Sequence, residues 1–177
     1  MKNWMNSKPH RQSESARTLG ILSDSHGRTS ITRQAVAALR EGGANLLLHL
    51  GDVETEEVID ELAVMPARIV FGNCDWDAAA LGRYARSLGI EVDHPAGRIE
   101  VDGRQVAFTH GHLQEWMESA LQEQVDYLLH GHTHVVRDET VGSTRLINPG
   151  ALFRARRYTA ALLTPATGAL RFVTISH

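Results

Sequence analysis

Short polar motifs recur along this chain of 177 residues, and most of them join a carboxylate, an amide or an imidazole to a glycine. They read D-S-H at 24–26, G-D at 51–52, G-N-C-D at 72–75, H-G-H at 110–112 and H-G-H-T-H at 130–134. Mixed nitrogen and oxygen donors of this kind suit Mn²⁺, Fe²⁺, Zn²⁺, Co²⁺ or Ni²⁺ better than Mg²⁺. The neighbouring glycines would let backbone approach a bound group closely. If the fold brings the motifs together, they predict a transition-metal site.

The first three motifs lie at the ends of short apolar runs that are typical of buried strands. We expect these strands at 18–24, 45–52 and 67–75, with amphipathic helices at 30–43 and 54–65 between them. Ser30 is a candidate N-cap and Gly42 a candidate stop of the first helix, and the second helix has an acidic first turn that suits its dipole. Alternation of strand and helix predicts parallel βαβ units. Ligands of such sheets bind beyond the carboxyl ends of the strands, where these motifs lie.

The second half of the chain changes its pattern. Residues 97–112 predict a hairpin that turns at Asp102-Gly103, 125–134 another buried strand, 137–150 a hairpin that turns near Gly142, and 157–176 two further strands. This half is expected to be mostly antiparallel. Both halves fit an α/β fold in which two mixed β-sheets pack as a sandwich flanked by helices. We expect a flexible N-terminal extension at 1–17 and a single domain at 18–177.

Composition limits the classes of partner. The formal net charge of −3 gives no general attraction to nucleic acid or to an anionic membrane. Cys74 is the only cysteine, which excludes an intrachain disulfide and fits a reducing compartment. The first seventeen residues lack the apolar segment of a secretory signal, so a cytoplasmic protein is expected. A homo-oligomer is left open by the sequence.

Each motif residue also has a purely structural explanation. Asp24 or Asp75 alone would more often cap a turn or helix, and Asn73 after a glycine is more often a turn residue. His49 is more simply a packed or surface-facing strand residue than a ligand, and His94, His10 and His177 are expected to be solvated. A structural explanation of the whole set would require five strand ends to carry such residues by coincidence. We therefore favour the functional interpretation.

In this order, and followed by I-N-P-G at 147–150, the motifs resemble the calcineurin-like metallophosphoesterases. The similarity covers Thr18 to the C-terminus and is greatest to their small bacterial and archaeal phosphodiesterase branch, which also resembles the retromer subunit Vps29. The resemblance implies a metal-dependent phosphodiesterase with a two-metal centre, Mn²⁺ being the first choice and Fe, Zn, Ni or Co alternatives. Two such ions would acidify a bridging water to hydroxide for attack on a small phosphodiester or nucleotide-like substrate.

The same resemblance implies the site residues. Asp24, His26 and His134 would hold one ion, Asn73, His110 and His132 the other, and Asp52 would bridge them. Catalytic roles are implied for Asp52, Asn73 and His112. His112 could contact the phosphate or orient a leaving group, or could simply pack. His130 precedes the glycine of its motif and is expected to support the ligands rather than to be one.

Two features leave the substrate open. Many relatives carry a histidine where Cys74 stands, and a thiol is a poor substitute for it as a general acid, which favours acidic leaving groups such as those of aryl phosphodiesters. Arg154, Arg156 and Arg157 follow Asn148-Pro149-Gly150 and could steer an anion or simply be solvated. The alternatives are a phosphomonoesterase or nucleotide pyrophosphatase, or a Vps29-like non-catalytic protein-binding module.

Overall fold

A computed structural model describes residues 16–176. The expected N-terminal extension therefore lies almost entirely outside the described residues, as do His10 and His177. Where the described chain begins, the backbone N–H of Arg17 donates to the Asp102 carboxylate at 2.8 Å. Across 16–176 we find no helix whose length and apolar character would let it cross a membrane.

The larger of two sheets has six strands in the order β11-β10-β1-β2-β3-β4. They are β1 (Leu19–Leu22), β2 (Leu46–His49), β3 (Ala67–Ile69), β4 (Glu91–Val92), β10 (Tyr158–Thr164) and β11 (Ala169–Ile175). Strands β1 to β4 pair in parallel, as their alternation with helices predicts. Strand β10 pairs antiparallel with both β1 and β11.

The smaller sheet has five strands in the order β5-β6-β7-β9-β8. They are β5 (Ala96–Val101), β6 (Arg104–Thr109), β7 (Tyr127–Leu129), β8 (Arg137–Val141) and β9 (Thr144–Asn148). The hairpins β5–β6 and β8–β9 are antiparallel, whereas β6–β7 and β7–β9 are parallel. Asp102 and Gly103 both have positive φ (52° and 77°), the conformation that a two-residue hairpin turn requires, so the predicted turn is confirmed.

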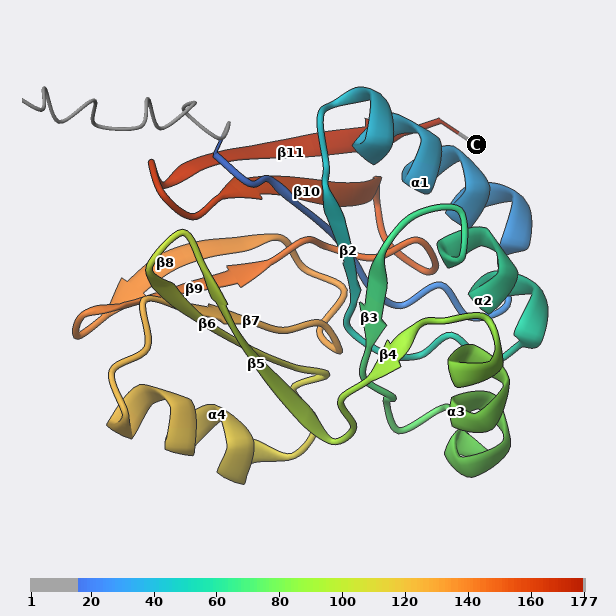
Figure 1. Cartoon of the computed structure of the whole chain (residues 1–177), viewed down its shortest axis with the longest axis horizontal. Coiled ribbons are helices and arrows are strands. Elements are labelled where there is room, and N and C mark those ends of the chain that lie inside the picture. Colours follow the sequence, from blue (N-terminus) through green and yellow to red (C-terminus); the bar gives the residue numbers. More distant parts are fainter. Residues whose placement is uncertain (1–15, 177) are drawn as a thin grey trace, which may run out of the picture.

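Helices cover the outer faces of both sheets (Figure 1). They are α1 (Thr29–Glu41), α2 (Glu56–Leu62), α3 (Ala78–Ser87) and α4 (Gln114–Gln122). The first three pack on the six-stranded sheet, and α4 packs on β6 and β7 of the smaller one. The two inner faces bury a shared core to which Ile21 and Leu48 contribute from one sheet and Phe108 and Leu129 from the other. The predicted sandwich of two mixed sheets flanked by helices is confirmed.

The second half is mostly antiparallel, as expected, but it also contains parallel strand pairs. The last two strands, β10 and β11, join the first sheet, and β7 pairs in parallel with both of its neighbours in the smaller sheet. Parallel neighbours need a crossover, and α4 supplies it between β6 and β7. Neither α3 nor α4 was predicted from the sequence, and without α4 the parallel pairing of β6 and β7 was not expected.

Helix ends follow the sequence only in part. The prediction that Ser30 caps α1 is wrong, because the helix begins at Thr29 after Arg28 and no side chain caps it. Gly42 does end α1, and its N–H donates to the Ala38 carbonyl. Helix α2 is shorter than expected, but Glu56 and Glu57 form its acidic first turn as predicted. Helix α3 is capped by Asp77, which accepts from the N–H of Ala80 at 2.9 Å.

Candidate metal centre

Backbone hydrogen bonds join the strand ends that carry the motifs. The N–H of Asp24 donates to the Gly51 carbonyl (3.0 Å), and the N–H of His26 donates to the Asp52 carbonyl (2.9 Å). In the other sheet, the N–H of Gly131 donates to the His110 carbonyl (2.9 Å). Because neighbouring parallel strands end at the same edge, donors far apart in the sequence meet there.

Asp24, His26 and His134 form the first group of potential ligands. His134 Nε2 lies 3.2 Å from Asp24 Oδ1 and 3.4 Å from His26 Nε2. One donor atom from each residue lies within 4.8 Å of the other two. Asp24 is fully buried, while both histidines are partly exposed. Burial raises the pKa of Asp24, but the proximity of His134, His110 and Ser23 together outweighs it, so the pKa lies below its usual value.

The second group lies around Asp52 and His110. His110 Nε2 is 3.4 Å from Asp52 Oδ2, and the rings of His110 and His132 meet edge to face with centroids 5.1 Å apart. The same Asp52 oxygen is 3.5 Å from His26 Nε2 in the first group. A single carboxylate oxygen thus lies between the two groups of imidazoles, the position that a bridging ligand would need.

The protonation pattern of His110 tests whether a cation fits here. His110 is buried, and its Nδ1 donates to the Leu50 carbonyl at 2.7 Å. Its Nε2 therefore directs a lone pair toward the Asp52 carboxylate unless the ring carries a second proton. Nε2 of His110 and Oδ1 of Asp24 are buried without a hydrogen-bond partner among the described residues. Buried acceptors that face one another are stabilised by a cation between them, so these residues fit a divalent metal.

The backbone of these residues is strained. Positive φ, which is uncommon outside glycine, occurs at Asp24 (55°), His26 (43°), Asp52 (55°), His132 (68°) and His134 (57°). Such conformations cost on the order of 1–3 kcal/mol each and cluster where function requires a fixed geometry. Their coincidence at the proposed ligands supports a preorganised site.

Two motif glycines allow the close approach that the sequence predicts. A Cβ atom on Gly72 would collide with the Asp52 carboxylate and stand 2.8 Å from the His110 ring. A Cβ atom on Gly131 would collide with Ser23 Oγ and stand 2.8 Å from the Asp24 carboxylate. Any larger residue at either position would displace a proposed ligand.

Glu54 supports His26 and was not found by sequence reasoning. Its carboxylate accepts from His26 Nδ1 at 2.7 Å, which leaves the Nε2 lone pair of His26 directed toward His134 and Asp52. A carboxylate on the far nitrogen of a histidine fixes its tautomer and orients it for a metal. The position of Glu54 two residues after G-D was the available signal.

Asp75 holds the loop that carries Asp52. Its two oxygens accept from the N–H groups of Asp52, Val53, Glu54 and Gly72 at 2.7–2.9 Å. Burial raises the pKa of Asp75 despite these hydrogen bonds. Asp75 therefore stabilises the turn at Gly72 and the loop after Asp52, whereas the cap of the following helix is Asp77.

His49 is packed rather than surface-facing. It is fully buried, its Nδ1 accepts from the N–H of Gly51 at 3.2 Å, and its Nε2 must then donate to Ser25 Oγ at 2.8 Å. Burial lowers the pKa of His49 to about 3, so the ring is neutral at physiological pH. It joins the two loops that carry the first group of ligands and Asp52.

Asn73 and Cys74 lie at the open side of the site. Asn73 is exposed, and its amide donates to Cys74 Sγ at 3.5 Å; within 16–176 it makes no hydrogen bond to the other proposed ligands. The backbone N–H of Cys74 donates to Asp52 Oδ1 at 2.9 Å. Burial and the charge of Asp52 raise the pKa of the thiol to about 11. Cys74 Sγ also lies within 4.8 Å of donor atoms of His26 and Glu54.

His112 and His130 differ in exposure. His112 is half-buried beside His110 and His132, whose ring centroids lie 5.3 and 6.2 Å away. Burial is the main cause that lowers the pKa of His112, and the two neighbouring rings lower it further. His130 is buried, and its Nδ1 donates to the Gly131 carbonyl at 3.1 Å, which agrees with the expected supporting role. The Asn148 amide donates to the same carbonyl at 2.9 Å, a contact that the I-N-P-G motif alone did not reveal.

A family model, the calcineurin-like phosphoesterase superfamily domain, matches residues 18–168. The chain belongs to this superfamily. The prediction of a metallophosphoesterase is thereby confirmed at the level of the family. A phosphodiesterase of Methanocaldococcus jannaschii is 29% identical over 136 residues, which span 75% of this chain and 82% of that protein.

Solved structures of the superfamily share the fold. An archaeal phosphodiesterase superposes with a TM-score of 0.81 at 25% identity, covering 89% of this chain and 99% of that one. A Vps29 variant of Entamoeba histolytica superposes with a TM-score of 0.62 at 19% identity, covering 90% and 99%. The second likeness concerns the fold alone, and it confirms the predicted similarity to Vps29.

Proposed function

We propose that this superfamily member is a phosphodiesterase that uses two divalent transition metal ions, Mn²⁺ being the first choice. Asp24, His26 and His134 would hold one ion, Asn73, His110 and His132 the other, and Asp52 would bridge them. The observation that carries the proposal is the Asp52 oxygen between His26 Nε2 and His110 Nε2, at 3.5 and 3.4 Å. Asn73 would have to turn its amide from Cys74 to join the second group.

The residues of the chain have distinct tasks in this proposal. When bound, the two ions would supply an activated water and neutralise charge on the phosphoryl oxygens. Asp52 sets the separation of the two groups of ligands, and Glu54 orients His26. His112, whose pKa is lowered by burial and by the neighbouring His110 and His132, would contact the phosphate or the leaving group.

Leaving-group chemistry supports a restricted set of substrates. The Cys74 thiol, with its pKa raised to about 11, is a much weaker acid than an imidazolium and therefore a poor general acid for a leaving group. Diesters with acidic leaving groups, such as aryl phosphodiesters, need little such help. The names of the archaeal relative and of the archaeal structure support a diester as the substrate.

The first experiment removes the bridging carboxylate. Asp52→Asn keeps the shape of the side chain but should lower kcat/KM for bis(p-nitrophenyl) phosphate with Mn²⁺ by on the order of 10³-fold. Asp138→Asn, which alters an exposed ion pair with Arg145, is the matched control and should retain activity. Undiminished hydrolysis by Asp52→Asn would refute the assigned centre.

A panel of esters under the same metal condition separates the remaining alternatives. A phosphomonoesterase would prefer p-nitrophenyl phosphate, and a nucleotide pyrophosphatase would prefer a dinucleoside polyphosphate. A Vps29-like binding module would hydrolyse none of these with any metal. We propose the cytoplasm as the location, because the lone Cys74 fits a reducing compartment.

A further inference from the structure

A cleft of ≈ 560 Å³ opens beside His134, a proposed metal ligand. Its walls are formed by 133–136, by 154–157, and by residues of β10 and β11 that include Thr159, Phe172 and Thr174. The volume lies within the range of sites that bind small molecules. Because His134 lines both the cleft and the metal centre, a molecule that reacts at the centre can extend into the cleft.

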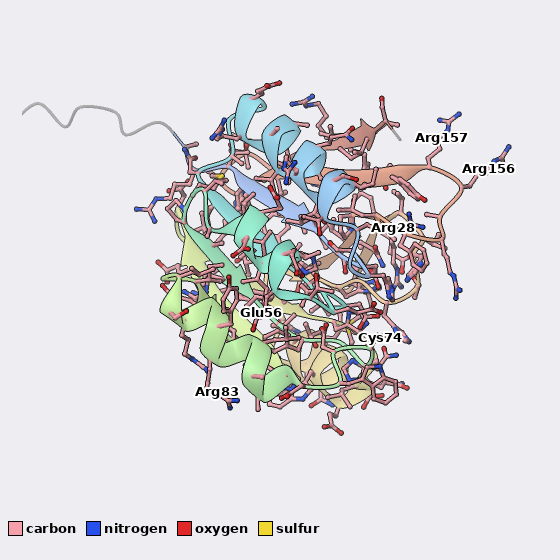
Figure 2. All side chains as sticks on the ribbon, turned by 90° about the vertical axis from the view of Figure 1, so that its right-hand side faces the viewer. Arg28, Glu56, Cys74, Arg83, Arg156 and Arg157 are labelled. Atoms are coloured by element: carbon pink, nitrogen blue, oxygen red, sulfur yellow. The ribbon has the colours of Figure 1, made fainter. Side chains whose placement is uncertain are left out.

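Arginine dominates the charge of this cleft. Arg154, Arg156 and Arg157 line it, all three are exposed, and none has an ion-pair partner among residues 16–176. Other arginines are neutralised by carboxylates, for example Arg68 by Asp93 at 2.6 Å and Arg145 by Asp138 at 2.7 Å. Figure 2 shows Arg156 and Arg157 projecting from the molecule on the same side as Arg28. The cleft therefore has uncompensated positive charge.

Phe153 contacts two arginines next to the candidate metal centre, and one of them, Arg154, belongs to the cleft. The guanidinium groups of Arg28 and Arg154 lie 4.8 and 5.0 Å from the centre of its ring, within the range of a cation–π interaction. The ring of His26 lies 5.1 Å from the same phenyl ring. Phe153 therefore contacts both His26 of the candidate metal centre and Arg154 of the cleft.

The cleft also offers apolar surface. Val135 is 64% exposed and Val136 is 43% exposed, although both are apolar, and they line the wall with Phe172. An organic group could cover these side chains while an anionic substituent reaches the guanidinium groups. Arginine is suited to that contact because its planar fork binds phosphate oxygens in pairs.

We propose that this cleft binds a second phosphate on the organic group of the substrate, so that the enzyme prefers phosphodiesters that carry a further phosphomonoester, as in a nucleotide with a 3′-phosphate. The inference rests on the proposed phosphodiesterase function and adds the substrate class to it. The scissile phosphate reacts at the metal centre, the organic group lies along Val135 and Val136, and the distal phosphate contacts Arg156 and Arg157.

A matched pair of substrates tests the proposal. Thymidine 5′-(p-nitrophenyl phosphate) and its 3′-phosphorylated derivative release the same leaving group and differ only in the distal phosphate. The wild type should show a kcat/KM at least about ten-fold higher for the phosphorylated substrate at low ionic strength, and added salt should reduce this ratio. Arg156→Ala/Arg157→Ala should bring the ratio close to one.

Arg83→Ala/Arg86→Ala is the matched control, because it removes two exposed arginines from α3, away from the cleft. This variant should keep the wild-type ratio. Equal kcat/KM for the two substrates in the wild type, or a preference that survives in Arg156→Ala/Arg157→Ala, would overturn the proposal.

Calorimetry separates the cleft from the catalytic function. If neither ester is hydrolysed with any metal, the phosphodiesterase proposal fails, and binding still tests the cleft. Thymidine 3′,5′-bisphosphate should then bind at least about ten-fold more tightly than thymidine 5′-monophosphate, and Arg156→Ala/Arg157→Ala should abolish the difference. Equal affinities of the wild type for the two nucleotides would count against the cleft.

Discussion

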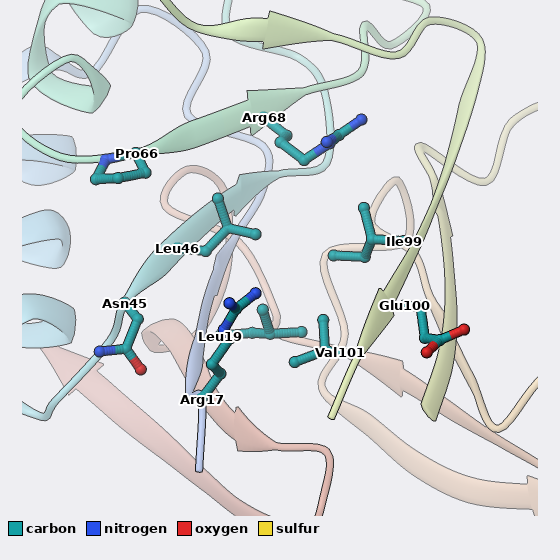
Figure 3. A pocket seen from close by; sticks show the side chains of 9 residues that line it. All are labelled: Arg17, Leu19, Asn45, Leu46, Pro66, Arg68, Ile99, Glu100 and Val101. Carbon is teal, nitrogen blue, oxygen red and sulfur yellow. The ribbon is translucent and has the colours of Figure 1, made fainter. Parts of the chain in front are cut away.

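The two ends of the sandwich differ in the surroundings of their charged and polar side chains. At the end where β1, β2 and β3 begin, a cavity of ≈ 370 Å³ lies between the sheets, with Leu19 and Leu46 on one side of it and Ile99 on the other (Figure 3). Arg68 extends into this cavity and is paired with Asp93 at 2.6 Å. At the end where the strands finish, Asp52 Oδ2 and His110 Nε2 are both buried and lie 3.4 Å apart.

The difference separates structural charge from functional charge. A buried or half-buried charge that serves the fold is paired, because an unpaired one destabilises the folded state. At the other end, atoms of the two groups of candidate ligands meet at strained backbone positions, and a cation bound between them would stabilise this arrangement. None of the residues described as lining the opposite cavity is a histidine.

The largest expected effect is steric. Gly72→Ala should lower the free energy of unfolding by about 3 kcal/mol or more, because the new Cβ collides with the Asp52 carboxylate. Gly103→Ala, at a hairpin turn with open space around it, should cost about 1 kcal/mol for its positive φ alone. Urea unfolding measures both. Equal losses would show that the strand ends at the candidate centre are not closely packed.

Stabilisation of the protein by Mn²⁺ should depend on Asp52 and should not depend on residues at the opposite cavity. Mn²⁺ at a hundred times its dissociation constant should raise the free energy of unfolding of the wild type by about 2.7 kcal/mol. Arg68→Ala, at the opposite cavity, should show the same increase, whereas Asp52→Asn should lose most of it. Thermal or urea unfolding with and without Mn²⁺ makes the comparison. An increase retained in Asp52→Asn would place the ion elsewhere.

Acid should weaken the protein through His49. Its pKa is about 3 in the folded protein and near 6.5 in the unfolded chain, so between these values the unfolded chain binds the extra proton and stability falls as pH falls. From pH 6.5 to pH 5 the loss should be about 2 kcal/mol. His49→Gln should remove this part of the pH dependence, and His94→Gln, at an exposed position, should keep it. Urea unfolding at the two pH values gives the answer, and identical slopes in all three proteins would contradict the assignment.

The smallest expected effect concerns the support of His26. Glu54→Gln should weaken Mn²⁺ binding by about ten-fold, because it removes the charge that orients the imidazole. Glu57→Gln changes an exposed glutamate in the first turn of α2 and serves as the control. Titration calorimetry measures both affinities. Equal affinities in the two variants would mean that the contact between Glu54 and His26 is incidental.

Much of the candidate site was predictable because its residues lie at strand ends. Short apolar runs identified β1, β2, β3, β6 and β7, and the polar residues just beyond them included Asp24, Asp52 and His110. Glu54 and Phe153 were not predicted from the sequence, because each acts through a contact with His26, which is distant in the sequence. Helix α4 was also missed, and with it the parallel pairing of β6 and β7.

The sequence by itself determined the kinds of donor and the strand ends on which they lie, because hydrophobic periodicity and glycine placement are local properties. Only the tertiary structure decided which donors face each other. The approach of one Asp52 oxygen to His26 and His110 depends on the order of strands in two different sheets and on the packing between them. Likewise, the cleft beside His134 exists because β10 and β11 join the first sheet, an outcome of long-range packing that no local pattern specifies.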